Sequence, residues 1–216
     1  MNFNKVRLVN YSQPPPEEHG GSLKEQLAYM ARVSNPKSQE AGKNPWKLIE
    51  FLIKEGHWSP LEMVSVALEI ETPRDIARQI LRHRSFSFQE FSQRYADPTE
   101  ALGFVSREAR LQDSKNRQNS LENEDEDLKD WWAEQQSTVT VAALSAYRYA
   151  ITAGIAKEQA RVVLPEGLTM SRMYMHGTLR SWYHYCAQRK REDTQKEHRD
   201  VAEKAWVIIE DLIEKH

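Results

Sequence analysis

The run VSVALEIETPRDIARQILRHR, residues 64–84, changes from a strand-like to a helix-like pattern within a few residues. Its first half is rich in β-branched residues, which favour an extended strand. Thr72 and Pro73 then form a cap and first-turn signal for a helix over residues 74–84. The sequence therefore predicts a mixed α/β (α+β) fold.

Hydrophobic periodicity, capping residues and residues that end helices or strands predict further elements. Residues 3–12 and 168–175 are candidate strands, and three prolines end the first of them. Helices are predicted over residues 23–34, 46–56, 127–154, 179–189 and 201–213. Ser22 precedes the first as a cap, Asn44 and Pro45 start the second, and Gly154 ends the third. Charges and amides dominate residues 106–130, where we expect a mobile loop or a solvated helix start.

Length and charge limit the kind of protein. A chain of 216 residues fits one domain, residues 1–216, without internal repeats. Hydrophobic residues make up 39% and charged residues 29%, which is enough apolar material for a core. A net charge of -2 argues against a general polyanion binder, so we expect no nucleic-acid partner and only a local basic site.

The single cysteine, Cys186, excludes an internal disulfide. We find neither a charged-then-apolar leader nor an apolar run of about 18 residues, and so expect neither secretion nor a membrane span. The reducing cytoplasm is the expected compartment.

Three arginines, Arg74, Arg78 and Arg82, recur at helical spacing, where like charges cost about 0.2 to 0.5 kcal/mol per pair. One interpretation is a solvated face with partners such as Glu71 and Asp75. The other interpretation is that these arginines bind an anion.

The segment RHRSFSFQEFSQR, residues 82–94, favours the anion. Arg82, His83 and Arg84 stand at a predicted helix end, where guanidinium forks suit phosphate groups. The serines, Gln89 and Glu90 that follow offer hydrogen bonds of both senses, as a nucleoside requires. The three phenylalanines of the segment are either core or base-stacking residues, and core is the more usual role.

Six positions in this segment, RHRxxSxxxxSxR, resemble the signature of the flavin-dependent thymidylate synthases, the ThyX family; they are Arg82, His83, Arg84, Ser87, Ser92 and Arg94. GHWSPLE and ARVVLP resemble two further family blocks, and the resemblance covers roughly residues 50–100 and 155–200. Met63 stands where the family usually has histidine, Thr178 and His184 replace common asparagines, and one residue is inserted between Pro165 and Arg180.

The resemblance implies a small, mostly antiparallel sheet flanked by long helices. It implies conversion of deoxyuridine monophosphate (dUMP) to thymidine monophosphate (dTMP), with methylenetetrahydrofolate as one-carbon donor and FAD, reduced by NADPH, as the hydride source. It also implies a homotetramer with active sites shared between subunits.

The resemblance assigns roles by motif position. The residues implied for dUMP are Gln79, Arg82, Glu90, Ser92, Gln93, Arg94, Arg161 and Arg189. The residues implied for FAD are Ser59, Arg82, His83, Arg84, Glu90, Thr178, Leu179, Arg180 and His184. Arg189 matches the catalytic arginine that polarises the pyrimidine, by stabilising negative charge on the ring.

Cys186 has no base matched to it in the sequence and is expected to be a core residue, which suits a flavin route without an enzyme nucleophile. His57 either stacks near the flavin or folds its loop, and no histidine or carboxylate spacing predicts a metal. Two alternatives stay open: a nucleotide- or RNA-binding module without redox activity, and a structural helical protein with solvated arginines.

Overall fold

The computed structural model describes residues 3–13, 22–40 and 44–215. Its centre is a four-stranded antiparallel sheet in the order β1-β2-β6-β3. The strands are β1 (Lys5–Tyr11), β2 (Ser65–Pro73), β6 (Met170–Thr178) and β3 (Ser87–Glu90). The two nine-residue strands, β2 and β6, pair over their whole length and form the middle of the sheet.

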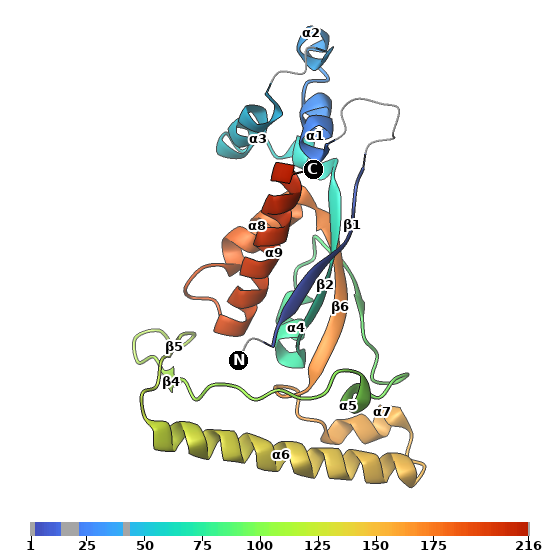
Figure 1. The fold of residues 1–216 in the computed structure, drawn as a ribbon, viewed down its shortest axis with the longest axis vertical. Helices are drawn as coiled ribbons and strands as arrows, with labels where there is room; N and C mark the ends of the chain where they lie inside the picture. The colour runs from blue at the N-terminus through green and yellow to red at the C-terminus, as the bar shows by residue number, and fades with distance from the viewer. Residues whose placement is uncertain (1–2, 14–21, 41–43, 216) are drawn as a thin grey trace.

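Two helices, α8 (Leu179–Arg189) and α9 (Lys196–Lys215), cover one face of this sheet (Figure 1). The strand β6 runs directly into α8, and the side chain of Thr178 caps the helix by accepting from the amide of Ser181. The helix α4 (Arg74–Ile80) follows β2 with no intervening loop and packs against β2, β6 and α9. The two strand-to-helix junctions lie at opposite ends of the β2–β6 pair, and the C-terminal end of α8 meets the turn that follows α4, where Arg189 bonds His83.

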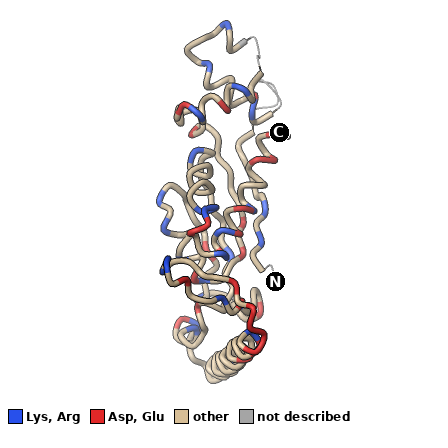
Figure 2. Tube along the Cα trace, turned by 90° about the vertical axis from the view of Figure 1, so that its left-hand side faces the viewer, with Lys and Arg blue, Asp and Glu red and all other residues tan. Residues whose placement is uncertain are grey.

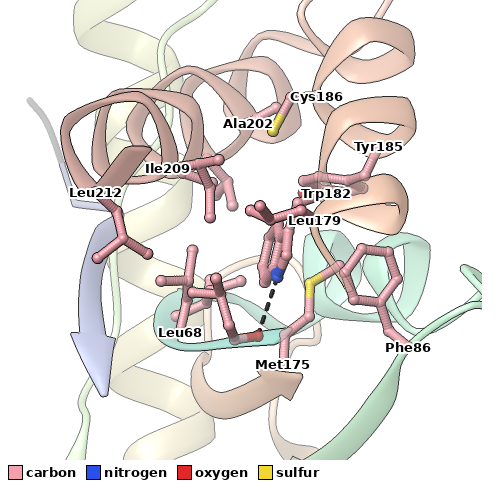
Figure 3. Packing of buried hydrophobic residues seen from close by; sticks show 14 of the residues in the cluster. Leu68, Phe86, Met175, Leu179, Trp182, Tyr185, Cys186, Ala202, Ile209 and Leu212 are labelled. Atoms are coloured by element: carbon pink, nitrogen blue, oxygen red, sulfur yellow. Dashed lines mark hydrogen bonds between the residues drawn. The ribbon is translucent and has the colours of Figure 1, made fainter. Parts of the chain in front are cut away.

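The hydrophobic core lies between the sheet and these helices (Figure 3). Trp182 of α8 is fully buried, and its indole Nε1 donates to the carbonyl of Val66 over 3.0 Å. Phe86 packs edge-on against Trp182, with ring centroids 4.9 Å apart. The apolar stripe of α9 closes the core with Val201, Ala205, Ile209 and Leu212. This packing holds α8, which carries Arg189, rigidly against the sheet.

One end of the molecule carries the short helices α1 (Leu23–Ala31), α2 (Pro36–Glu40), α3 (Pro45–Lys54) and η1 (Ser59–Glu62) (Figure 1). The helix α1 begins with a full capping box between Ser22 and Glu25. The helix α3 has Pro45 in its first turn and is followed by Gly56, whose φ of 70° only glycine adopts readily.

The opposite end carries the 27-residue helix α6 (Glu126–Thr152), which crosses the molecule apart from the sheet (Figure 1). Around it lie α5 (Pro98–Ala101), the two-stranded β4 (Leu111–Gln112) and β5 (Ser120–Leu121), α7 (Lys157–Ala160) and η2 (Arg161–Val163). Few side chains of α6 are buried within the chain.

The mixed fold and its small antiparallel sheet confirm the predicted fold class, and the predicted strands and helices correspond to β1, α1, α3, β2, α6, β6, α8 and α9. The cap of α4 was predicted wrongly. Pro73, not Thr72, occupies the N-cap position, and the Thr72 hydroxyl instead donates to Asn4 Oδ1 over 2.8 Å. The helix ends at Ile80, so Arg82, His83 and Arg84 follow it rather than form its last turn. The strand β3 and the helix α2 were not predicted.

Residues 106–125 contain more structure than their composition indicated. Beside the β4–β5 hairpin, Arg107 forms a two-pronged ion pair with Asp75 of α4. Arg110 likewise holds both carboxylate oxygens of Glu197 on α9, at 2.7 and 2.9 Å. The segment is therefore anchored to two helices of the central body.

Candidate functional site

The RHR triplet lies in the turn between α4 and β3. Arg82 and Arg84 are exposed, and in the described part of the chain neither guanidinium group makes a hydrogen bond or ion pair. His83 between them is half-buried and packs edge-on against Tyr185, with ring centroids 4.9 Å apart. The turn therefore presents two free cations on either side of an anchored imidazole.

His83 connects this turn to α8. Its Nε2 accepts a hydrogen bond from Nε of Arg189 at 2.9 Å. Burial, followed by the nearby charges of Arg189 and Arg82, lowers the pKa of His83 to about 4. A neutral His83 keeps a lone pair on Nε2 for Arg189, so the predicted catalytic arginine and the predicted FAD-binding triplet share one cluster.

Gln79 lies on the other side of this cluster. Its Nε2 donates to Gln195 Oε1 over 2.7 Å, and its Oε1 contacts His198 Nδ1 at 3.3 Å. His198 stands 6.2 Å from His83 between ring centroids. The buried His198 and the half-buried His83 thus lie between Gln79, a predicted dUMP residue, and Arg189, the catalytic candidate.

A second group of predicted residues surrounds Glu90 at the end of β3. Its carboxylate pairs with Arg78 at 3.1 Å, lies 3.8 Å from Arg74, and accepts from Ser171 Oγ at 2.9 Å. Glu166 also pairs with Arg78, at 3.2 Å. Glu90 and Glu166 offset the repulsion between these two arginines.

The partners Glu71 and Asp75, expected for a solvated arginine face, are used elsewhere. Glu71 pairs with Lys5 and Arg172 across the sheet, and Asp75 pairs with Arg107. That part of the interpretation was wrong, because strand pairing brings Lys5 and Arg172 to Glu71, and the segment after α5 brings Arg107 to Asp75.

The remaining predicted dUMP residues lie in the turn after β3 and in η2. Arg94 pairs with Glu158 of α7 at 3.4 Å, and the Ser92 hydroxyl accepts from the amide of Arg94 at 3.4 Å. Gln93 is buried, and its Nε2 has no hydrogen-bond partner among the described residues. The guanidinium of Arg161 is likewise unpaired within that part of the chain. Burial lowers the pKa of Arg74, and the nearby positive charges of Arg78 and Arg161 lower it further.

The start of α8 contains the last set of predicted FAD residues. Thr178 is the cap, and Ser181 beside it donates to the carbonyl of Ser85 over 3.2 Å, which joins α8 to the RHR turn. Arg180 pairs with Glu62 of η1, and the ring of the exposed His184 packs against Trp58 at a tilt of 58°, with centroids 4.4 Å apart. These contacts bring the GHWSP block beside α8.

Two residues of this set differ from the rest. The side chain of Leu179 is only 2% exposed and belongs to the core, while Ser59 is exposed at the first position of η1. His57 is exposed and contacts Phe51 edge-on at 5.9 Å, which fits the role of folding its own loop. Met63 is exposed as well.

Cys186 is a core residue, as predicted. It is fully buried, and burial raises the pKa of its thiol to about 12, so no thiolate is present at neutral pH. Phe86 is also buried, against Trp182 and Tyr185, which confirms the core role for that phenylalanine.

Sequence reasoning missed two residues that support the site, Gln195 just before α9 and His198 within it. A signal for His198 was present, because it occupies the same helical stripe as Val201, Ala202 and Ala205. A histidine in an apolar stripe points inward, and here it points at Gln79.

Basic and acidic residues are interspersed along the Cα trace (Figure 2). Among the described residues, no three histidine, cysteine or carboxylate side chains are grouped so that they could hold a metal ion. No helix in the described ranges has the length and apolar character needed to cross a membrane.

Known proteins resemble this chain over most of its length. Residues 18–213 match the family model described as thymidylate synthase complementing protein. A flavin-dependent thymidylate synthase from Synechocystis sp. is 49% identical over 199 residues, which are 91% of this chain and 90% of the relative. A probable flavin-dependent thymidylate synthase of Paramecium bursaria Chlorella virus 1 is 46% identical, with 91% and 89% of the two chains covered.

A similar solved structure is that of the UMP/dUMP methylase PolB from Streptomyces cacaoi, crystallised with 5-Br dUMP. It matches with a TM-score of 0.77 and 27% identity, over 97% of this chain and 90% of that one. These similarities give no support to a binding module without redox activity. The chain therefore belongs to the thymidylate synthase complementing protein family, whose members include the flavin-dependent thymidylate synthases.

Proposed function

We propose that this flavin-dependent thymidylate synthase converts dUMP to dTMP with FAD, that NADPH reduces the FAD, and that methylenetetrahydrofolate supplies the one-carbon unit. The observation that carries the proposal is the hydrogen bond between Arg189 and His83, which joins the pyrimidine-activating candidate to the flavin-binding triplet. A dUMP analogue in the related methylase and the flavin-dependent relatives support the substrate and the cofactor.

The donor groups at the RHR turn fit FAD. The guanidinium groups of Arg82 and Arg84 lack protein partners among the described residues, and such forks pair well with a pyrophosphate. The start of α8 adds Thr178, Arg180 and His184 nearby, with Ser59 exposed on the adjoining η1. Bound FAD would supply the hydride chemistry, which no side chain can provide.

On the nucleotide side, the chain offers one activating and several binding groups. Nε of Arg189 is committed to His83, while its two terminal nitrogens make no hydrogen bond within the described residues and can face the pyrimidine. A fixed guanidinium there would stabilise negative charge on the ring. The residues that we propose to bind dUMP are Gln79, Arg82, Glu90, Ser92, Gln93, Arg94 and Arg161, with Arg189.

We propose a homotetramer with shared sites because α6 exposes large apolar side chains. Tyr149 is 77% exposed, Val141 65% and Trp131 53%, and Val162 is 78% exposed on η2, which packs against α6. A contiguous exposed apolar patch marks a protein interface, and we propose that these side chains contribute to one. Arg94 and Arg161 lie at this end of the molecule, so a second subunit that covers α6 would approach both. We propose the cytoplasm as the compartment of this assembly.

The test is a product assay on purified protein. We expect bound flavin, visible by absorbance, and formation of dTMP from dUMP only when methylenetetrahydrofolate and NADPH are both supplied. Flavin-loaded protein that oxidises NADPH but never forms dTMP would contradict the proposed reaction. Tight dUMP binding by protein that takes up no flavin would contradict the cofactor.

A further inference from the structure

A line of hydrogen-bonded side chains runs from the 106–125 segment to α4 and ends at a buried histidine. Arg110 donates to both oxygens of Glu197, and Gln195 Nε2 donates to Glu197 Oε2 over 3.0 Å. Gln79 Nε2 donates to Gln195 Oε1 over 2.7 Å, and Gln79 Oε1 lies 3.3 Å from His198 Nδ1. Gln195 and Gln79 each use both the nitrogen and the oxygen of the side-chain carboxamide in this line.

The direction of each bond in this line is fixed by the carboxylate of Glu197. Burial raises the pKa of Glu197, but its own backbone amide and Arg110 outweigh burial, and the net pKa is lowered. An ionised carboxylate only accepts hydrogen bonds, so Gln195 must present its amino group there and its oxygen to Gln79. Gln79 in turn must present its amino group to Gln195 and its oxygen to His198.

The last bond then determines the tautomer of His198. Since Gln79 Oε1 only accepts, the proton must be on Nδ1 of the imidazole. His198 is fully buried, and its Nε2 has no partner among the described residues. Burial, with Arg189 and His83 nearby, lowers the pKa of His198 to about 3, so the ring is neutral at physiological pH.

We propose that His198 is a positioning residue: Gln195 orients the carboxamide of Gln79, and the Nδ1–H of His198 holds its oxygen in place, so that one defined donor and acceptor pair faces the nucleotide. The proposal rests on the proposed place of Gln79 in the dUMP site. With two of its hydrogen bonds used, Gln79 keeps one N–H and one oxygen lone pair for a ligand. If the carboxamide flipped, its N–H and its oxygen would exchange places, so that donor would face donor and acceptor would face acceptor at the nucleotide.

Two variants separate positioning from packing. His198→Leu fills the space but has no donor, whereas His198→Asn is smaller and carries an amide N–H near the position of Nδ1. Packing alone predicts that the Asn variant, with its cavity, melts at the lower temperature and binds dUMP more weakly. Positioning predicts the opposite order for dUMP: His198→Leu weakens binding about three- to tenfold, and His198→Asn stays within about twofold of the parent.

The measurements use FAD-loaded protein, with dUMP affinity, flavin occupancy and melting temperature recorded for each variant. The same His198→Leu change in a Gln79→Ala background should cost no further affinity, because the residue that it positions is gone. Equal losses in both backgrounds, or equal affinities for the Leu and Asn variants, would overturn the positioning role.

Gln79→Ala alone separates failure of this inference from failure of the proposed site. If Gln79→Ala weakens dUMP binding but His198→Leu does not, only the positioning role is wrong. If Gln79→Ala leaves dUMP binding unchanged, the placement of Gln79 in the nucleotide site is wrong, and the positioning role is wrong with it. Nitrogen NMR of ¹⁵N-histidine-labelled protein gives an independent reading: we expect the proton of His198 on Nδ1, and a proton on Nε2 would contradict the proposed direction.

Discussion

Arg189 Nε and His83 Nε2 are joined by a hydrogen bond of 2.9 Å, although the two residues are 106 positions apart in the sequence. The bond exists because α8 follows β6 directly and the RHR turn precedes β3, which pairs with β6. It requires a neutral His83, which burial secures by lowering the pKa. The orientation of Arg189 therefore depends on a residue that we propose to be part of the flavin-binding motif.

Arg84→Ala should weaken FAD binding. The guanidinium of Arg84 is exposed and unpaired within the described residues, so its removal costs a charge-assisted bond to the cofactor and little else. Such a bond is worth roughly 1.5 to 3 kcal/mol, or about ten- to a hundredfold in affinity. We expect purified Arg84→Ala to lack flavin absorbance and to regain it in excess FAD. Arg117→Ala, in the β4–β5 hairpin, is the matched control and should remain yellow.

Cys186→Ala should leave turnover nearly unchanged. The thiol is fully buried with its pKa raised to about 12, and nothing in its surroundings activates it as a nucleophile. The cost is lost packing, about 1 kcal/mol in the free energy of unfolding. Steady-state rate and urea unfolding measured together check this; a folded, flavin-loaded variant that has lost orders of magnitude in rate would show that the cysteine takes part in the chemistry.

Acid should destabilise the fold before the carboxylates titrate. The pKa of His83 is lowered from 6.5 to about 4 and that of His198 from 6.5 to about 3, so below about pH 6.5 the unfolded chain takes up protons that the folded protein refuses. The free energy of unfolding should therefore fall from pH 6.5 to about pH 4, by up to about 1.4 kcal/mol per pH unit for each histidine.

Denaturant unfolding at one protein concentration and several pH values measures this slope. His198→Leu should show a shallower slope, since it removes one of the two groups. A parent protein with constant stability between pH 6.5 and 5 would mean that these histidines are not held neutral. Glu69, whose pKa is lowered from 4.5 to about 2, stabilises the fold at these pH values and loses that contribution only below about pH 4.5.

The sequence predicted the elements better than it predicted the site's supports. The strand β6 and the helix α8 were predicted from two short runs, residues 168–175 and 179–189, but the cap at their junction, Thr178, was not predicted. Thr72 was wrongly predicted to cap α4, because its hydroxyl instead bonds Asn4, which is 68 residues away along the chain. Motif positions identified His83 and Arg189 separately, but no local pattern could reveal that the sheet brings them together.

The exposed apolar face of α6 should control assembly. Val141→Glu places a charge on a side chain that is 65% exposed in the chain but would be covered in the proposed tetramer. We expect light scattering to give a tetramer mass for the parent and a smaller mass for the variant, with a parallel loss of activity. Ser145→Glu, at an exposed position one turn further along the same face of α6, should have the same effect. A fully active monomeric parent at micromolar concentration would refute the shared-site assembly.

The most direct test of the account is single-turnover formation of dTMP by Arg189→Ala beside the parent, with flavin occupancy measured in the same samples. If Arg189 stabilises charge on the pyrimidine, the variant keeps its flavin and its NADPH-driven reduction, and forms dTMP about a hundred- to a thousandfold more slowly. Arg189→Ala that forms dTMP at the parent rate would show that the arginine held by His83 is not the activating residue.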